Sequence, residues 1–425
     1  MLGGIFDSSR LRRRWQLLIL TILLSIILLL FFRHEGRPRE LSDPVPLNQL
    51  GISPHNQGIG HRLVKPSGVK VIGLIFFGRK DRVQILQCFL ERNLAVNGGW
   101  LDEIHWIRNT DIKADVDYLH KIVASNPAYR VIEIKETGFV GYGLAWTTLQ
   151  PDAIYVKIDD DVVWLADDTI PRIVSTKLEH PEYLVVSANM INSPLMGWVH
   201  YHMSAIKPYL PEVINPEDVP PSLAPDKDAR PPPPSRIPWR YSAHPQWTGP
   251  DDYLFSHDQE TPAMRHRWLR LPTSQDDLVK QLHRTPISEA EYKTWGNSLQ
   301  SWAIAAQQHY SFLENLCDNK LDLYQFSAGG LPWVTDYRRV SINLIAVNST
   351  EILEHLPMDT VDEEWLTVSL PKRIQKSVAV DTHALAVHFS FGTQGSVATT
   401  DLLGRYLDYA QENACMADSP GSYWI

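Results

Sequence analysis

The fold of this chain is indicated by the stretch YVKIDDDVVW, Tyr155–Trp164, where an apolar run ends in three aspartates and a second apolar run follows. Residues i and i+2 of a strand point the same way, so we expect Asp159 and Asp161 to converge while Asp160 faces away. Two carboxylates suit Mg²⁺ or Mn²⁺, and a cation with a bound diphosphate would neutralise the cluster. The alternative is a solvated acidic turn, because acidic triplets alone are weakly specific.

The segments around this stretch alternate between strand and helix patterns. Strands are expected at 69–78, 101–109, 129–135, 153–159 and 183–191, and helices at 82–97, 115–125 and near 141–149. This order predicts an α/β fold with a mostly parallel central sheet sandwiched by helices. Ligands of such sheets bind beyond the carboxyl ends of the strands, and the aspartates lie at such an end.

Composition narrows the functional classes. The chain has 425 residues, a net charge of −9 and three cysteines. The negative charge argues against general nucleic-acid binding, which requires a basic face. Three widely separated cysteines show no metal-ligand spacing and permit one disulfide without indicating its pairing.

The N-terminal region predicts membrane attachment. Residues 15–32 carry no charge and are long enough to span a bilayer, so we expect a cytosolic tail at 1–14, a transmembrane anchor at 15–32, a stem at 33–67 and a catalytic domain at 68–425. The flanking arginines favour a cytosolic N-terminus. A cleaved signal peptide is the alternative. The lumenal sequon at Asn348 is then a candidate glycosylation site.

Two later segments have distinctive compositions. Residues 208–250 contain thirteen of the thirty prolines, which no ordinary core element can hold, and we interpret them as an insertion or lid over the working edge of the sheet. Residues 286–316 are helical in pattern, with Ser288 as the expected N-cap. Short strands are expected after residue 333.

The aspartate stretch resembles the Asp-x-Asp signature of nucleotide-sugar glycosyltransferases of the GT-A fold. Its form, Lys-x-Asp-Asp-Asp-Val, is similar to that of the Golgi type II β-1,3-glycosyltransferases, as is the preceding GLAWTTLQPDA at 143–153. The resemblance covers about residues 69–200. The family's downstream Glu-Asp-Val motif is absent, and the proline-rich segment is unlike the family, so the linkage chemistry is not carried over.

This resemblance implies a site with a metal and a base. Asp159 and Asp161 would bind Mn²⁺ or Mg²⁺, and His388, late in a strand-like run, would be the third ligand. The acidic run Asp362, Glu363 and Glu364 would supply the base that accepts the proton of the acceptor hydroxyl, with Glu363 or Glu364 preferred. The alternatives are a buried structural histidine and an acidic helix N-terminus.

The resemblance also places the nucleotide along the end of the first strand. Phe77, Gly78, Arg79, Arg82 and Asp160 are the cofactor-binding candidates there, with the arginines suited to phosphate. The alternative is a basic turn that caps the next helix.

Two further sets of contacts are predicted. The resemblance implies that Asp111 or Asn109, at the end of the second strand, would meet the base or ribose. Trp198 and Trp247, which flank the proline-rich segment, are candidates to stack on the acceptor.

We therefore expect a metal-dependent transferase that moves a sugar from a nucleoside-diphosphate sugar, a UDP-sugar by resemblance, to a glycan, lipid, protein or small-molecule acceptor. It would be a single-pass type II membrane protein of the Golgi or endoplasmic reticulum. The alternatives are a lumenal metal-dependent nucleotidyl- or phosphotransferase and a non-catalytic binding protein on the same fold. Asp161→Asn is expected to abolish transfer and leave the fold intact.

Overall fold

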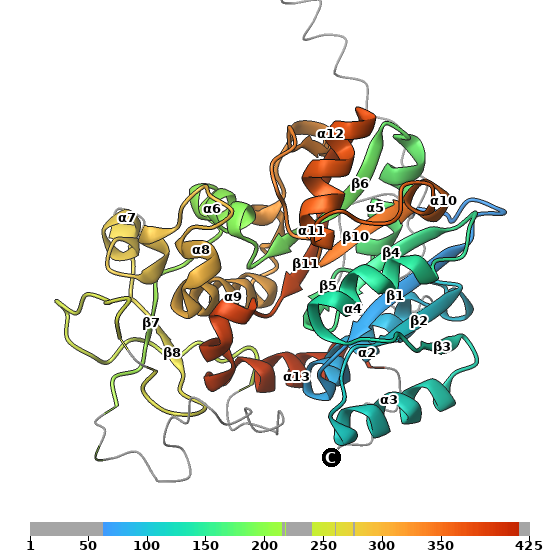
Figure 1. The fold of residues 1–425 in the computed structure, drawn as a ribbon. Helices are drawn as coiled ribbons and strands as arrows, with labels where there is room; N and C mark the ends of the chain where they lie inside the picture. The colour runs from blue at the N-terminus through green and yellow to red at the C-terminus, as the bar shows by residue number, and fades with distance from the viewer. Residues whose placement is uncertain (1–62, 215–216, 218–239, 260, 275–276, 416–425) are drawn as a thin grey trace, which may run out of the picture. The chain divides into compact units, whose positions relative to one another are not determined.

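The computed structural model describes residues 63–214, 217, 240–259, 261–274 and 277–415 (Figure 1). The predicted tail, the anchor at 15–32, nearly all of the stem and most of the proline-rich segment lie outside the described residues. Within the described ranges, no helix has the length and apolar character needed to cross a bilayer.

A central sheet of nine strands organises the described residues. Its order is β3-β2-β1-β4-β10-β6-β11-β5, and β9 pairs with β11 beside this path. The strands are β1 (Val71–Phe77), β2 (Glu103–Arg108), β3 (Tyr129–Ile132), β4 (Ile154–Asp159), β5 (Val162–Leu165), β6 (Tyr183–Ile191), β9 (Trp333–Val334), β10 (Leu344–Asn348) and β11 (Ser377–His388). The five strands expected before residue 192 are all present.

The direction of the strands differs from the prediction in one half of the sheet. Strands β3, β2, β1 and β4 are parallel, as their apolar runs and intervening helices predict. Strand β10 is antiparallel to both of its neighbours, and β11 is parallel to β6 but antiparallel to β5 and β9. The sheet is therefore mixed, and the expectation of a mostly parallel sheet holds only for its N-terminal half, because burial of a strand does not reveal its direction.

Helices cover both faces of the sheet, as the sequence predicts (Figure 1). Alternate residues of β1 belong to two separate cores: Val71 and Phe77 to one, Ile72 and Phe76 to the other. The longer helices are α2 (Lys80–Asn93), α3 (Lys113–Ser125), α4 (Gly138–Ala145), α5 (Thr169–Glu179), α6 (Pro194–His202), α9 (Trp302–Cys317) and α13 (Leu402–Asn413). The shorter ones are α7 (Leu278–Leu282), α8 (Asn297–Gln300), α10 (Ser349–Leu353), α11 (Asp362–Glu364) and α12 (Leu370–Ile374).

The helical segment at 286–316 begins differently from the prediction. Residues Pro286–Glu289 form a short 3-10 turn, in which the Ser288 hydroxyl donates to the carbonyl of Thr285 instead of capping a helix. The long helix α9 begins only at Trp302, and its N-cap is Ser301, whose hydroxyl accepts from the amide of Ile304 at 3.3 Å. A serine therefore caps the long helix, as such a residue type favours, but it is Ser301 and not Ser288.

The ends of the proline-rich segment are held by a small sheet and a helix. Strand β7 (Tyr209–Pro211) pairs with β8 (Trp268–Arg270). Near the other end of the segment, the amide of Tyr241 donates to Asp408 on α13 at 3.1 Å. The lid function stays a prediction.

One disulfide joins distant parts of the chain. Cys88 on α2 is bonded to Cys415, which follows α13, and Cys317 is a free thiol. The bond links the C-terminal helix to the helix that follows β1.

Candidate metal centre and adjoining pocket

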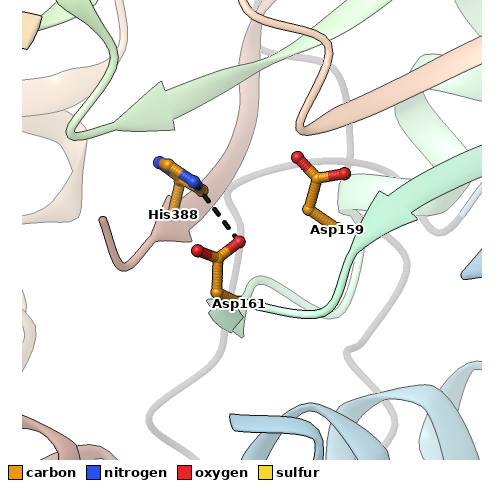
Figure 2. A group of neighbouring side chains, drawn as sticks. All are labelled: Asp159, Asp161 and His388. Carbon is orange, nitrogen blue, oxygen red and sulfur yellow. Dashed lines mark ion pairs between the residues drawn. The ribbon is translucent and has the colours of Figure 1, made fainter. Parts of the chain in front are cut away.

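Three side chains predicted as metal ligands converge at the end of β4. Asp159 is the last residue of β4, Asp161 precedes β5, and His388 ends β11, which pairs with β5. One ligand atom from each lies within 4.8 Å of the others. Figure 2 shows the three side chains facing one another, with His388 Nε2 3.3 Å from Asp161 Oδ1. Asp159 and Asp161 therefore converge as predicted, although Asp160 and Asp161 form the turn between β4 and β5 and are not part of a strand.

The two oxygens of Asp161 have different surroundings. Oδ2 lies 3.1 Å from Arg79 and 3.0 Å from Arg82, whereas Oδ1 faces His388. Because the arginines engage one oxygen, the other is directed toward the histidine and Asp159. Such outer partners orient metal-ligating carboxylates.

Asp159 is held by a residue of its own strand and by the residue that precedes β10. Asn343 Nδ2 donates to its Oδ2 at 2.8 Å, and Lys157 pairs with its Oδ1. Lys157 is itself buried and donates to the carbonyl of Ile342 at 2.8 Å. Lys157, Arg79 and Arg82 thus pair with the aspartates in addition to the cation and bound diphosphate that the sequence suggested as neutralising partners.

The two aspartates differ in their electrostatics. Burial raises the pKa of Asp159, and neighbouring Asp161 adds to this against the opposing charge of Lys157. Burial also acts to raise the pKa of Asp161, but His388, Arg79 and Arg82 outweigh it and hold that pKa well below its usual range. Asp161 is therefore the more acidic member of the pair.

The donor set fits a divalent cation. Two carboxylates and one imidazole, of which Asp161 and His388 are buried and Asp159 is partly exposed, match the oxygen-rich coordination of Mg²⁺ or Mn²⁺, with Mn²⁺ better suited to the nitrogen ligand. A cation at this place would be held by Asp159, Asp161 and His388.

Asp160 faces the opposite way, toward the turn after β1. Its Oδ2 accepts from the amide of Gly78 at 2.9 Å, and its carboxylate pairs with Arg79. A Cβ on Gly78 would lie 3.1 Å from that oxygen, so glycine permits this close approach. Asp160 and Gly78 therefore join the aspartate turn to the β1 edge.

The other cofactor-binding candidates at the end of the first strand differ in their exposure. Phe77 is fully buried against Trp106 and Tyr118, so it supports the turn and has no open face for a base. Arg82 is also buried and pairs with Asp161. Because its guanidinium is not open to a ligand, its assignment to phosphate is corrected. Arg79 keeps 41% of its side chain exposed and stays a candidate phosphate contact.

The second-strand candidates lie on an exposed loop. Asp111 is 72% exposed and pairs with Arg108 at 2.7 Å. Asn109 is occupied structurally, because its Oδ1 accepts from the amide of Gly138 at the start of α4, at 2.8 Å. A contact of Asp111 with the base or ribose stays a prediction.

A pocket of about 360 Å³ adjoins the metal candidates. The ring of Phe391, on its wall, lies 4.4 Å from that of His388 between centroids. The pocket lining is apolar with several hydroxyl groups: Ser193, Pro194, Leu195, Thr294, Trp295, Leu299, Arg339, Val340, Ser341, Glu363, Phe391, Gly392 and Thr393.

Of the three acidic candidates for the base, only Glu363 lines this pocket. Its Oε1 accepts from Arg339 Nε at 2.6 Å, and burial raises its pKa against the opposing charge of Arg339. Glu364 lies 3.5 Å from the same arginine. Asp362 instead accepts from Trp146 Nε1 at 3.4 Å. Desolvation is the main cause of the raised pKa of Glu363.

The tryptophan at the pocket is not one of those predicted. Trp295 lines it, is 63% exposed, and has the guanidinium of Arg339 4.6 Å from its ring centroid. Trp198 stacks on His202, and Trp247 packs against Tyr253; neither lines the pocket. No local pattern singles out Trp295 or Arg339, because their neighbours come from distant segments.

Asn348 has a structural role at the predicted glycosylation site. It ends β10, and its side-chain oxygen accepts from the amide of Glu351 at 3.2 Å, which caps α10. Glycan attachment stays a prediction.

Comparisons with known proteins give no family by sequence. No protein-family model and no curated protein matches the chain. A structure of GalNAc-T7 with UDP, GalNAc and Mn²⁺ is similar at a TM-score of 0.39 and 10% identity, covering 81% of this chain and 50% of that one.

Two more solved structures match smaller parts. Glucosyl-3-phosphoglycerate synthase from Mycobacterium tuberculosis, with Mn²⁺, UDP-glucose and phosphoglyceric acid, has a TM-score of 0.25 and 13% identity over 33% of this chain and 51% of that one. 4-Diphosphocytidyl-2C-methyl-D-erythritol synthase from Anaerococcus prevotii has a TM-score of 0.23 and 14% identity over 29% of this chain and 56% of that one. The chain thus spans about half the length of these proteins. Likenesses at this level assign no residue a role.

Proposed function

We propose that this chain is a divalent-metal-dependent glycosyltransferase that moves a sugar from a nucleoside-diphosphate sugar, a UDP-sugar in the first instance, to an acceptor hydroxyl. The observation that carries the proposal is the arrangement of Asp159, Asp161 and His388 beside a pocket that contains Glu363. Metal ligands and a desolvated carboxylate on neighbouring walls are what transfer from a diphosphate to a hydroxyl requires.

Each group at the site has a separate role in the proposed reaction. A bound cation supplies electrostatic stabilisation of the leaving diphosphate. Arg79, partly exposed at the same edge, donates to phosphate oxygens. In an inverting reaction, Glu363 accepts the proton of the attacking hydroxyl, and its raised pKa suits this role because a stronger base takes the proton more readily.

The pocket suits an acceptor with a sugar ring. Trp295 offers an exposed aromatic face, and flat aromatic surfaces pack against the apolar face of a sugar. The hydroxyl groups of Ser193, Ser341 and Thr393 provide hydrogen bonds around it. Arg339 is neutralised by Glu363 and Glu364, so an uncharged acceptor matches the pocket better than an anionic one.

The proposal includes membrane attachment. The apolar run at 15–32 and its arginine flanks support a single-pass type II protein of the Golgi or endoplasmic reticulum. The catalytic part would then be lumenal, with a glycan on Asn348.

The proposal is tested on the full-length chain, kept in a detergent without a sugar headgroup. UDP should raise the melting temperature only when Mn²⁺ is present, and incubation with UDP-sugars should release UDP together with a glycosylated acceptor. A nucleotidyl- or phosphotransferase would yield a different nucleotide product. A melting shift without turnover of any donor would favour a non-catalytic binding protein, and no Mn²⁺-dependent shift would contradict the metal site.

A further inference from the structure

The backbone of Phe389 connects the candidate metal ligands. Its amide donates to the carbonyl of Asp161 at 2.8 Å. Its carbonyl accepts from Asn192 Nδ2 at 3.0 Å and from His309 Nε2 at 2.8 Å. Because Phe389 follows His388 directly, these three bonds fix the spacing between His388 and Asp161.

Asn192 reaches this backbone from the end of β6. It is fully buried and has a φ of 59°, in the left-handed region that asparagine tolerates better than most residues. Its carbonyl lies 3.5 Å from His388 Nδ1. The backbone of Asn192 therefore faces His388, and its side chain binds the backbone of Phe389.

A second buried amide extends the contact to the pocket wall. Gln394 and Asn192 form a reciprocal pair, with Asn192 Nδ2 donating to Gln394 Oε1 at 3.0 Å and Gln394 Nε2 lying 3.3 Å from Asn192 Oδ1. Gln394 also accepts from the amide of Phe391 at 3.1 Å and donates to the carbonyl of Ser298 at 2.9 Å. The paired amides thus hold His388 and the wall formed by Phe391, Gly392 and Thr393.

We propose that Asn192 and Gln394 are positioning residues that couple the metal centre to the acceptor pocket. Fully satisfied buried amides are rigid, and removal of one leaves the other without its partner, so the segment from His388 to Gln394 keeps one arrangement. A cation that binds His388 and an acceptor that packs on Phe391 then favour the same arrangement, and each strengthens binding of the other. This inference rests on the proposed function.

The hydrogen-bonded pair of Asn192 and Gln394 is called the clamp below. Two substitutions remove it by different means. Asn192→Gly keeps the left-handed backbone conformation accessible and deletes the side-chain amide. Gln394→Met keeps the approximate length of the side chain and deletes its hydrogen bonds. The control is Asn315→Ala, because Asn315 is an equally buried amide that donates to Ala205 and Tyr324 and to none of the groups above.

The measurement is the affinity of the full-length chain for Mn²⁺ in the presence of UDP, with free Mn²⁺ detected by electron paramagnetic resonance below the melting temperature of each variant. We expect both clamp variants to bind Mn²⁺ about tenfold more weakly, as loss of outer partners of metal ligands does, and Asn315→Ala to bind it normally. The KM for the acceptor should rise in the clamp variants too. If Asn192→Gly fails to fold, Gln394→Met decides.

The outcomes separate the two proposals. Clamp variants with unchanged Mn²⁺ affinity and acceptor KM, or an equal loss in Asn315→Ala, would overturn the coupling and leave the proposed function standing. A wild-type chain that binds no Mn²⁺ with UDP would overturn both.

Discussion

The guanidinium of Arg82 lies 3.0 Å from Oδ2 of Asp161, and both side chains are almost completely buried. Arg82 belongs to α2, the helix after β1, while Asp161 lies in the turn between β4 and β5. The ion pair therefore fastens the aspartate turn to the N-terminal half of the sheet. It also means that an aspartate predicted mainly as a metal ligand is at the same time part of the folded core.

Asp161→Asn should lower both Mn²⁺ affinity and stability. Breaking a buried ion pair from one side costs about 3–5 kcal/mol, because Arg82 would keep its charge without a partner. This differs from the expectation from sequence that the fold would be unaffected. Urea unfolding and Mn²⁺-dependent UDP binding measure the two effects.

Asp159→Asn is the matched variant. Asp159 is more exposed than Asp161, so we expect loss of Mn²⁺ binding with a smaller loss of stability. Normal Mn²⁺-dependent UDP binding by either variant would rule out its role as a ligand.

Glu363→Gln should reduce the rate of transfer by a factor of about 10² to 10⁴ while Mn²⁺ and UDP bind normally. Because burial raises the pKa of Glu363, the wild-type rate should fall as the pH drops through that raised pKa and the carboxylate becomes protonated. The variant should lack this limb of the pH profile. Glu364→Gln is the control, and an equal loss there would assign the effect to Arg339 instead.

Trp295→Ala should weaken acceptor binding without destabilising the protein. An aromatic contact of this kind contributes about 0.5–1.5 kcal/mol, so the acceptor KM should rise about 2- to 12-fold. Stability should change by less than about 0.5 kcal/mol, since the side chain is mostly exposed. Trp198→Ala, outside the pocket, should leave the KM unchanged; the reverse pattern would contradict the assignment.

Acid should destabilise the fold through buried neutral histidines. Burial lowers the pKa of His200 and His309 to about 3 and that of His244 to about 4. In the unfolded chain the histidine pKa is about 6.5, so on acidification the unfolded state binds protons at a higher pH than the folded state does. The contribution to stability is therefore complete above that pH. It should fall as the pH drops from about 6.5 toward 4, by up to about 1.4 kcal/mol per pH unit for each histidine. Urea unfolding at pH 7 and pH 5 tests this, and equal stability would contradict it.

Reduction of the disulfide should lower stability by about 2–5 kcal/mol, because Cys88–Cys415 restricts the unfolded chain across 327 residues. Melting temperatures with and without dithiothreitol measure the effect. The double variant Cys88→Ser with Cys415→Ser should melt lower and no longer respond to reductant, while Cys317→Ser should behave as wild type. A wild-type melting temperature in the double variant would show that the bond contributes nothing.

Much of the site could be predicted from local patterns. Asp159 and Asp161 lie on one side and Asp160 on the other, as the strand period predicted, although the turn after β4 produces the arrangement. A histidine at a strand end was a reasonable third ligand. The partners of these residues could not be predicted, since Asn343, Arg82 and Asn192 reach the site from separate segments. The pocket lined by Glu363 and Trp295 was missed for the same reason, and the predicted tryptophans lie elsewhere.

The sequence by itself determined the parallel half of the sheet and the aspartate pair at its edge, because the two-residue period of a strand and the apolar runs act over a few neighbouring residues. Only the tertiary structure decided the direction of β10 and β11, the cationic partners of the aspartates and the walls of the pocket. These depend on contacts between residues far apart in the chain, where burial alone is compatible with many pairings.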